Sequence, residues 1–301
     1  MTFSQSPIQR IRQLAVHLEE NHPCLRKPIE LTWNTYEQVV FQASISWNRL
    51  QYREKEAKIQ PRRLLRIDSS QIDYYLGSHF DFLADSGRVI GGEWDRNKTS
   101  FEETTFHQSF VEHFQEEVPW KKTKLYKRGI EAIEKGEYSR NRSVEAFEVR
   151  LSRFDMIFEQ IANEGYRTQR ELIQSELDPT RSVATTGLIP YVDTDVIRHE
   201  IAVNIGREGR FFVNDGRHRV SMAKILDIKN LPIRIIVRHK EWQELRKEVA
   251  RTIEAAIASG VASDDIRTQV EDSLHEELED VFLGLDHPDL HILFERRLAE
   301  A

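Results

Sequence analysis

The run Asn214-Asp215-Gly216-Arg217-His218-Arg219 contains residue types that bind anions. An apolar run, Phe211 to Val213, precedes it, and the apolar residues that follow have helical spacing (Val220, Ala223, Leu226). The pattern predicts a strand, a tight turn and a helix. The first turn of a helix offers unpaired backbone N–H groups and a positive dipole end, which suit a phosphate. A phosphate site is therefore one interpretation; an Asp-Gly turn that caps a helix with surface cations is the other.

If the run is a phosphate site, each side chain has an expected role. Gly216 lets the backbone turn sharply and approach the phosphates. Arg217, His218 and Arg219 supply cationic donors, and an arginine fork matches phosphate oxygens better than a lysine does. Asp215 is expected to hold Mg²⁺ or to orient a nucleophile. Its alternative role is a helix cap.

A glycine-flanked loop is expected from Gly87 to Asp95, and its end, Gly91-Gly92-Glu93-Trp94-Asp95, is a second place where residues could do chemistry. Glu93 and Asp95 could serve as a catalytic base or metal ligand, and Trp94 could stack on a nucleobase. The alternative is a tight surface loop with Trp94 anchored in the core.

A basic cluster is the best candidate for a nucleic-acid surface, because cations interleaved with Trp120 and Tyr126 suit a phosphate backbone and its bases. Its members are Lys121, Lys122, Lys124, Lys127 and Arg128. The net charge of the whole chain is −7, so the protein lacks the overall basic field of a dedicated duplex binder.

Composition narrows the class of protein. The 301 residues suffice for one large domain or two small ones, and 31% of them are charged. No apolar run approaches the roughly 20 residues of a membrane span, and the N-terminus lacks the apolar core of a signal peptide. The single cysteine, Cys24, excludes an intramolecular disulfide and a Cys-rich zinc site. The cytoplasm is the expected compartment.

Periodicity predicts several helices and strands around these residues. Helices are expected over 7–20, over 30–58 with Tyr36, Val39, Val40, Ala43 and Trp47 on one face, over 144–164 ending at Gly165, over 170–177, over 217–227 and from 241 to about 258. A strand is expected at 62–68, then a turn through Ile72, Tyr75 and Leu76 that Ser69 or Ser70 caps. A hairpin is expected at 200–213 with its turn at Gly206 to Gly209, and a further strand at 233–237. The remainder, 264–301, is acidic and helix-prone.

This arrangement resembles the ParB/sulfiredoxin superfamily. The shared parts are the hairpin 200–213, the glycine turn Gly216 to Arg219, the helix after it, and the strand that Pro232 introduces. Residues 158–169 resemble the family's helix-then-glycine segment, and 65–68 resemble its opening strand. The resemblance implies an α+β fold: a small mixed sheet at 61–240 with an insertion at about 98–150, a helical N-terminal extension at 1–60, and a helical acidic C-terminal extension at 241–301.

The resemblance also implies a nucleotide, ATP, ADP or CTP, with Mg²⁺, bound at the turn. Arg217 stands where sulfiredoxin has a cysteine, which argues against sulfinic-acid repair. Ser221 stands where partition proteins have a later arginine, which weakens a DNA clamp. The Asp-Gly-Arg-His-Arg turn is closer to the free-serine-kinase-like branch. The resemblance thus implies a phosphotransferase or phosphohydrolase acting on a small-molecule or protein acceptor; the alternative is a nucleic-acid-associated module, either a CTP-gated DNA binder or a nuclease.

Overall fold

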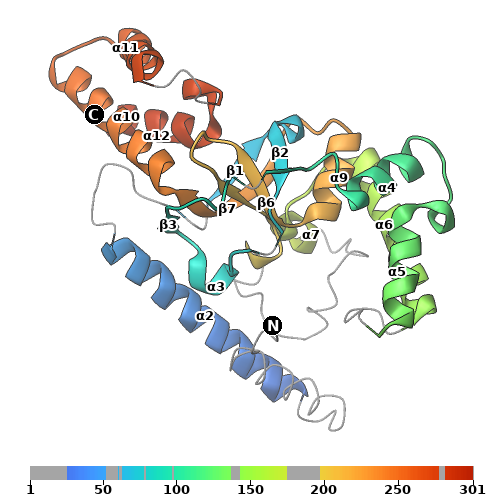
Figure 1. Ribbon diagram of the computed structural model, residues 1–301. Helices are drawn as coiled ribbons and strands as arrows, with labels where there is room; N and C mark the ends of the chain where they lie inside the picture. The colour runs from blue at the N-terminus through green and yellow to red at the C-terminus, as the bar shows by residue number, and fades with distance from the viewer. Residues whose placement is uncertain are drawn as a thin grey trace.

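The computed structural model describes residues 26–51, 60, 63–77, 79–96, 98–136, 143–174, 197–277 and 282–300, and the structural statements below concern these residues. The helix expected over 7–20, residues 52–58 of the helix expected over 30–58, and the last three residues of the segment expected at 170–177 lie outside them. The described residues form a mixed α+β fold around an open seven-stranded sheet (Figure 1). No described helix is long and apolar enough to cross a membrane.

The sheet mixes parallel and antiparallel pairs. Its strands are β1 (Leu64–Ile67), β2 (Ile72–Tyr75), β3 (Arg88–Ile90), β4 (Thr99–Ser100), β5 (Ile201–Ile205), β6 (Phe211–Asp215) and β7 (Leu231–His239). They lie in the order β1-β7-β5-β6-β2-β4. β1 pairs antiparallel with the first half of β7, and β3 pairs parallel with its end. β5 is parallel to β7 and antiparallel to β6, and β2 is parallel to β6.

The predicted hairpin of β5 and β6 is confirmed. Its turn spans Gly206 to Gly209, where the Gly206 amide donates to the Arg210 carbonyl over 3.0 Å. Gly209 has a φ of +85°, and a Cβ there would lie 2.7 Å from the ring of Trp242. Both the backbone angle and the close packing therefore require glycine at this position.

The central strands are covered on both faces, which explains their nearly continuous apolar sequences. Alternate residues of β5 point to opposite faces. Ile201, Val203 and Ile205 join a core with α9 (Arg217–Ile225) and the C-terminal helices α10 (Lys240–Ala258), α11 (Ser263–Glu277) and α12 (Pro288–Ala299). Ala202 packs on the other face with Phe80 and Trp94. The C-terminal helices thus share the hydrophobic core of the sheet (Figure 1).

The insertion between β4 and β5 is helical and has a core of its own. It contains α4 (Thr105–Phe114), α5 (Lys124–Glu134), α6 (Val144–Glu164) and α7 (Gln169–Gln174). Helix α6 begins and ends where the sequence predicts: the Ser143 side chain accepts from the Ala146 amide, and Gly165 ends the helix with a φ of +78°. Its buried aromatic residues pack with Met222 of α9.

Helix α9 is therefore held from two sides (Figure 1). Val220 and Ala223 belong to the core of the sheet, whereas Met222 belongs to the core of the insertion. Residues three apart lie on one side of a helix, and a residue between them faces another direction. This double packing fixes the start of α9 at one end of the sheet, beside the end of α6.

The prediction for the second helix was partly wrong. Helix α2 spans Arg26–Gln51, and it buries Phe41 and Ile45. The apolar face expected to pack, which includes Val39 and Trp47, is exposed, with 62% and 63% of these two residues accessible. Phe41 stacks on Phe82 of α3 (Phe82–Asp85) with 4.7 Å between ring centroids, so the position of α3 selects the buried face.

The turn predicted through Ile72, Tyr75 and Leu76 was also wrong. Residues 72–75 form β2, because the parallel neighbour β6 supplies hydrogen-bonding partners that local sequence does not reveal. A single 3₁₀ turn, Ser69–Gln71, precedes the strand, and Asp68 caps it by accepting from the Ser70 amide over 2.8 Å. Part of the expected glycine loop likewise forms β3.

Candidate functional site

The predicted turn connects β6 to α9 through a left-handed glycine. Gly216 has a φ of +85°, and a Cβ there would lie 3.1 Å from Cγ1 and 3.2 Å from Cα of Ile201. The Val220 amide donates to the Gly216 carbonyl over 3.0 Å and starts the helix. In an α-helix the amides before this first bond, those of Arg217 to Arg219, have no acceptor within the helix itself. The turn therefore has the backbone that the phosphate interpretation requires.

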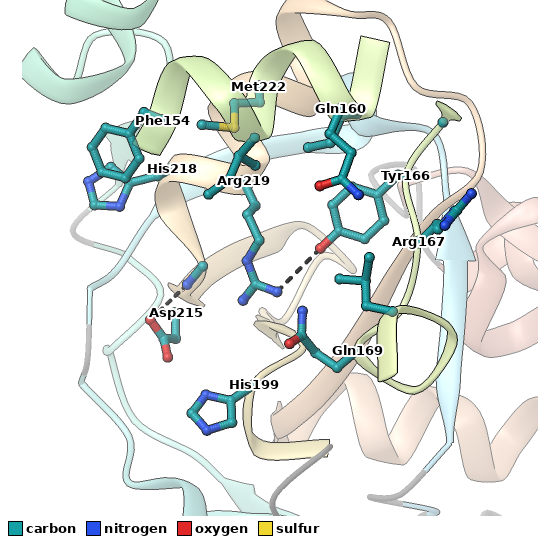
Figure 2. A pocket seen from close by; sticks show the side chains of 15 residues that line it. Phe154, Gln160, Tyr166, Arg167, Gln169, His199, Asp215, His218, Arg219 and Met222 are labelled. Carbon is teal, nitrogen blue, oxygen red and sulfur yellow. Dashed lines mark hydrogen bonds between the residues drawn. The ribbon is translucent and has the colours of Figure 1, made fainter. Parts of the chain in front are cut away.

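A cavity of about 250 Å³ opens at this turn (Figure 2). Its polar wall brings together the turn, the start of β5 and the segment between α6 and α7. The residues of that wall are Gln160, Gly165, Tyr166, Arg167, Gln169, His199, Asp215, Gly216, His218 and Arg219. The apolar wall consists of Phe154, Ile157, Ile161, Leu172 and Met222. Three separate stretches of sequence, 154–172, the residues just before β5, and 215–222, thus converge on the predicted site.

Arg219 is the central cation of the cavity. Figure 2 shows its guanidinium reaching toward Tyr166 on one side and lying near Asp215 and His199. Its Nη1 donates to the Tyr166 hydroxyl over 3.4 Å. Burial by itself lowers the pKa of Arg219, but Tyr166, Glu200 and Asp215 together raise it above its ordinary value. Arg219 therefore stays positively charged at any physiological pH.

Sequence reasoning missed two residues beside Arg219: the partly buried Tyr166 and the buried Glu200. Burial raises the pKa of Tyr166 to about 12, so its hydroxyl keeps its proton. Burial also raises the pKa of Glu200, which is 1% exposed and accepts from the Gln169 amide over 2.7 Å. The only sequence signal for the burial of Glu200 is its position next to an apolar strand. Polar residues alternate with apolar ones there, and that pattern predicts an exposed glutamate instead.

His218 lines the cavity, but its ring is packed among aromatic side chains. The ring centroid lies 4.7 Å from that of Phe154 and 5.7 Å from that of Phe110. The structure brings Gly216, His218 and Arg219 together as the sequence predicts. The side chain of Arg217 is not part of the cavity wall: its Nη1 donates to the Tyr75 hydroxyl over 3.1 Å, and its guanidinium lies 5.0 Å from the Phe106 ring.

Asp215 lies on the cavity wall at the end of β6, and its side chain is exposed. Its Oδ1 accepts from the Gly216 amide over 2.7 Å, so the aspartate also braces the turn. Among the described residues, no group of three His, Cys, Asp or Glu side chains could hold a metal ion. Mg²⁺ often binds one or two carboxylates together with substrate phosphates, so a single aspartate would hold it only together with such a ligand.

Glu93 and Asp95 are not in the cavity. Asp95 is 2% exposed and pairs with Arg207, whose Nη2 donates to Oδ1 over 2.8 Å and whose backbone amide donates to Oδ2 over 2.8 Å. Burial by itself raises the pKa of Asp95, but the bonds from Arg207 bring it below its ordinary value. Glu93 is exposed and pairs with Arg96, while the indole of Trp94 donates to the Ile90 carbonyl. This loop anchors the β5–β6 hairpin.

The basic cluster lies on the insertion, and all five of its cations are exposed. Lys121 pairs with Glu148 over 2.9 Å, and the Tyr126 hydroxyl donates to the same carboxylate. Trp120 is 9% exposed and donates to Asp155, so it does not offer a face to a base.

Comparisons with models of protein families, with curated proteins and with solved structures found no significant match.

Proposed function

We propose that the protein binds a nucleotide through its phosphates in the cavity between β6 and α9, and that it is an ATP- or ADP-dependent phosphotransferase or phosphohydrolase of the ParB/sulfiredoxin type. One observation carries the proposal: the left-handed turn at Gly216, the guanidinium of Arg219 and the carboxylate of Asp215 open onto the same cavity. Phosphoryl transfer needs its phosphates positioned and their charge neutralised, and little covalent help from the protein.

The electrostatics favour an anion. Arg167 and Arg219 line the cavity with the single carboxylate of Asp215. Arg167 also pairs with Glu164 over 3.2 Å, so Arg219 is the cation most available to an anion. Behind the wall, Arg234 of β7 is 2% exposed, and its Nη2 donates to the Arg198 carbonyl over 3.2 Å. Burial lowers the pKa of Arg234 to about 9, so it remains charged at neutral pH. In a poorly solvated site these charges act more strongly than they would in water.

The two walls suit the two ends of a nucleotide. The turn and Arg219 would bind phosphate oxygens, and the apolar wall formed by α6 and Met222 offers a surface for the base or for the acceptor. Asp215 would hold Mg²⁺ with the phosphates or orient the attacking hydroxyl or water. Mg²⁺, when bound, would neutralise part of the charge of the phosphates.

Titration calorimetry with ATP, ADP and CTP, with and without Mg²⁺, tests the proposal. Arg219→Ala is expected to weaken binding about 10- to 100-fold, the worth of a lost charge-assisted bond. Arg217→Ala is the matched control, since it removes an arginine from the same helical turn whose side chain lies outside the cavity. If the wild-type protein binds none of the three nucleotides, or if both variants bind equally well, the proposal fails. Release of phosphate then separates turnover from binding alone.

A nucleic-acid module remains the alternative, and the five exposed cations at 121–128 favour it. It predicts a salt-dependent mobility shift that is lost when Lys121, Lys122, Lys124 and Lys127 are replaced by alanine. Binding that the replacement leaves unchanged, or no shift at low salt, would exclude this surface.

A further inference from the structure

A second, much smaller cavity lies between β1, β7 and the C-terminal helices α10 and α12, and arginines outnumber carboxylates in its lining. It measures about 20 Å³ and is lined by side chains from β1, β7, α10, α12 and the residues before β1. Four of these side chains are arginines, Arg63, Arg238, Arg246 and Arg296, and only Asp289 is acidic. The lining residues therefore carry an excess of three positive charges, and Glu300, 3.6 Å from the Nε of Arg296, offsets part of it from outside the lining.

The single carboxylate is already fully engaged. Asp289 is 3% exposed and accepts from Nε and Nη2 of Arg238 over 2.8 and 2.7 Å. The indole of Trp242 donates to the same carboxylate over 3.0 Å, and Nη1 of Arg246 lies 3.2 Å from it. Burial by itself raises the pKa of Asp289, but Arg238 and Arg246 lower it well below the ordinary value. The carboxylate is thus charged, and it balances one of the four cations.

Two arginine N–H donors at this cavity have no hydrogen-bond acceptor among the described residues. Arg246 is 4% exposed, and its Nε has no hydrogen-bond partner among the described residues. The buried Nε of Arg296 likewise lacks a hydrogen-bond partner there, and it lies 3.6 Å from the carboxylate of Glu300. A buried charged donor without an acceptor is strongly unfavourable, and native proteins rarely leave one unsatisfied. Burial, and repulsion from Arg238 and Arg296, lower the pKa of Arg246 to about 10.

We propose that this cavity binds one monovalent anion of about the size of chloride, held by the guanidinium groups of Arg246 and Arg296. The volume suffices for a single water-sized particle, which excludes sulfate, phosphate and any nucleotide. A water molecule would accept from the same donors, but it would leave the excess charge unbalanced. The bound anion joins α10 and α12 to β7, and it is independent of the nucleotide proposal.

Thermal unfolding in chloride and in gluconate, at one ionic strength, tests the proposal. A ligand that binds only the folded state raises Tm. At a ligand concentration about ten times its Kd, the rise in a chain of this length is about 2–4 °C. Replacing gluconate by chloride should raise the Tm of the wild-type protein by that amount. The rise should vanish in Arg246→Met and in Arg296→Met.

Arg297→Met is the matched control. Arg297 neighbours Arg296 on α12, does not line the cavity, and pairs with Glu254 over 2.8 Å. This variant should keep the dependence on chloride. A dependence retained in both cavity variants would assign the effect to another place and overturn the proposal.

Crystals of the wild-type protein grown in bromide give a second measurement that does not depend on any variant folding. An anomalous peak between Arg246 and Arg296 is expected. Tm values that are equal in chloride and gluconate, together with no bromide peak, would mean that water alone fills the cavity, and the proposal would be wrong.

Discussion

Asp95 and Asp215 both lie in glycine-containing turns, and the sequence marks both as candidate catalytic residues, but the structure gives them opposite surroundings. Asp95 is buried and bonded to the guanidinium and the amide of Arg207. Asp215 is exposed on a cavity wall near the cation of Arg219, whose hydrogen bond goes to Tyr166 instead. Asp95 and Arg207 satisfy each other's hydrogen bonds and charge. Asp215 and Arg219 do not bond each other, and both charges face the cavity.

The difference shows that the partner of a charged group, more than its type, indicates what the group does. A carboxylate whose oxygens already accept several bonds from an arginine has little capacity left for a metal ion. Its contribution is to hold two segments together, here the Gly91–Asp95 loop and the β5–β6 hairpin. An aspartate and an arginine that face one cavity without bonding each other keep that capacity for a ligand.

The largest expected effect on stability is that of Asp95→Ala. Removing one partner of a buried ion pair leaves the other charge unpaired, which costs about 3–5 kcal/mol. Denaturant unfolding measures it, and Glu93→Gln in the same loop is the control, since Glu93 is exposed and should change stability by less than about 0.5 kcal/mol. Folded Asp95→Ala protein should keep its nucleotide affinity; a selective loss of binding would return Asp95 to the site.

The same ion pair predicts a pH dependence with a definite sign. The pKa of Asp95 is lower in the folded protein than its ordinary value of 3.8, so its contribution to stability is complete above that value. The contribution is lost as the pH falls through the folded-state pKa. Asp95→Ala removes this contribution at every pH. Denaturant unfolding should therefore show that the variant loses less stability than the wild-type protein as the pH falls below 3.8.

Gly216→Ala should have an intermediate effect, on stability and on binding together. A non-glycine residue at positive φ is strained by about 1–3 kcal/mol, and the added Cβ would press on Ile201. Gly92→Ala separates the two causes, because Gly92 has a φ of +92° but no atom within 4 Å of its added Cβ. We expect Gly216→Ala to lose more stability than Gly92→Ala, and it alone should weaken nucleotide binding. Equal effects in both assays would show that the turn does not shape the cavity.

The elements around the site were largely predictable, because each has a local signal. Alternating and continuous apolar runs predicted β5, β6 and β7, and Gly165 predicted the end of α6. The partners were not predictable, because they depend on contacts between distant segments. Helix geometry turns each residue by about 100°, so Arg217 and Arg219 point in different directions. Only the packing of α9 against both the sheet and the insertion determines that Arg219 faces the cavity.

Glu200 lies behind the cavity, and its replacement should give the smallest effect and the sharpest test of the comparison. Burial raises its pKa in the folded protein above the ordinary value of 4.5, the opposite direction from Asp95. Its stabilising contribution is therefore complete below pH 4.5 and is lost as the pH rises through the folded-state pKa. Glu200→Gln keeps an acceptor for the Gln169 amide and removes the ionisation, so Tm should fall less between pH 4.5 and neutrality than in the wild-type protein. Glu208→Gln, at a partly exposed residue that pairs with Lys98, is the control and should leave that slope unchanged. If the change of Tm with pH is the same in Glu200→Gln as in the wild-type protein, Arg219 and Arg234 already compensate the charge of the carboxylate. The positive charge available to a ligand in the cavity would then be smaller than the lining residues indicate.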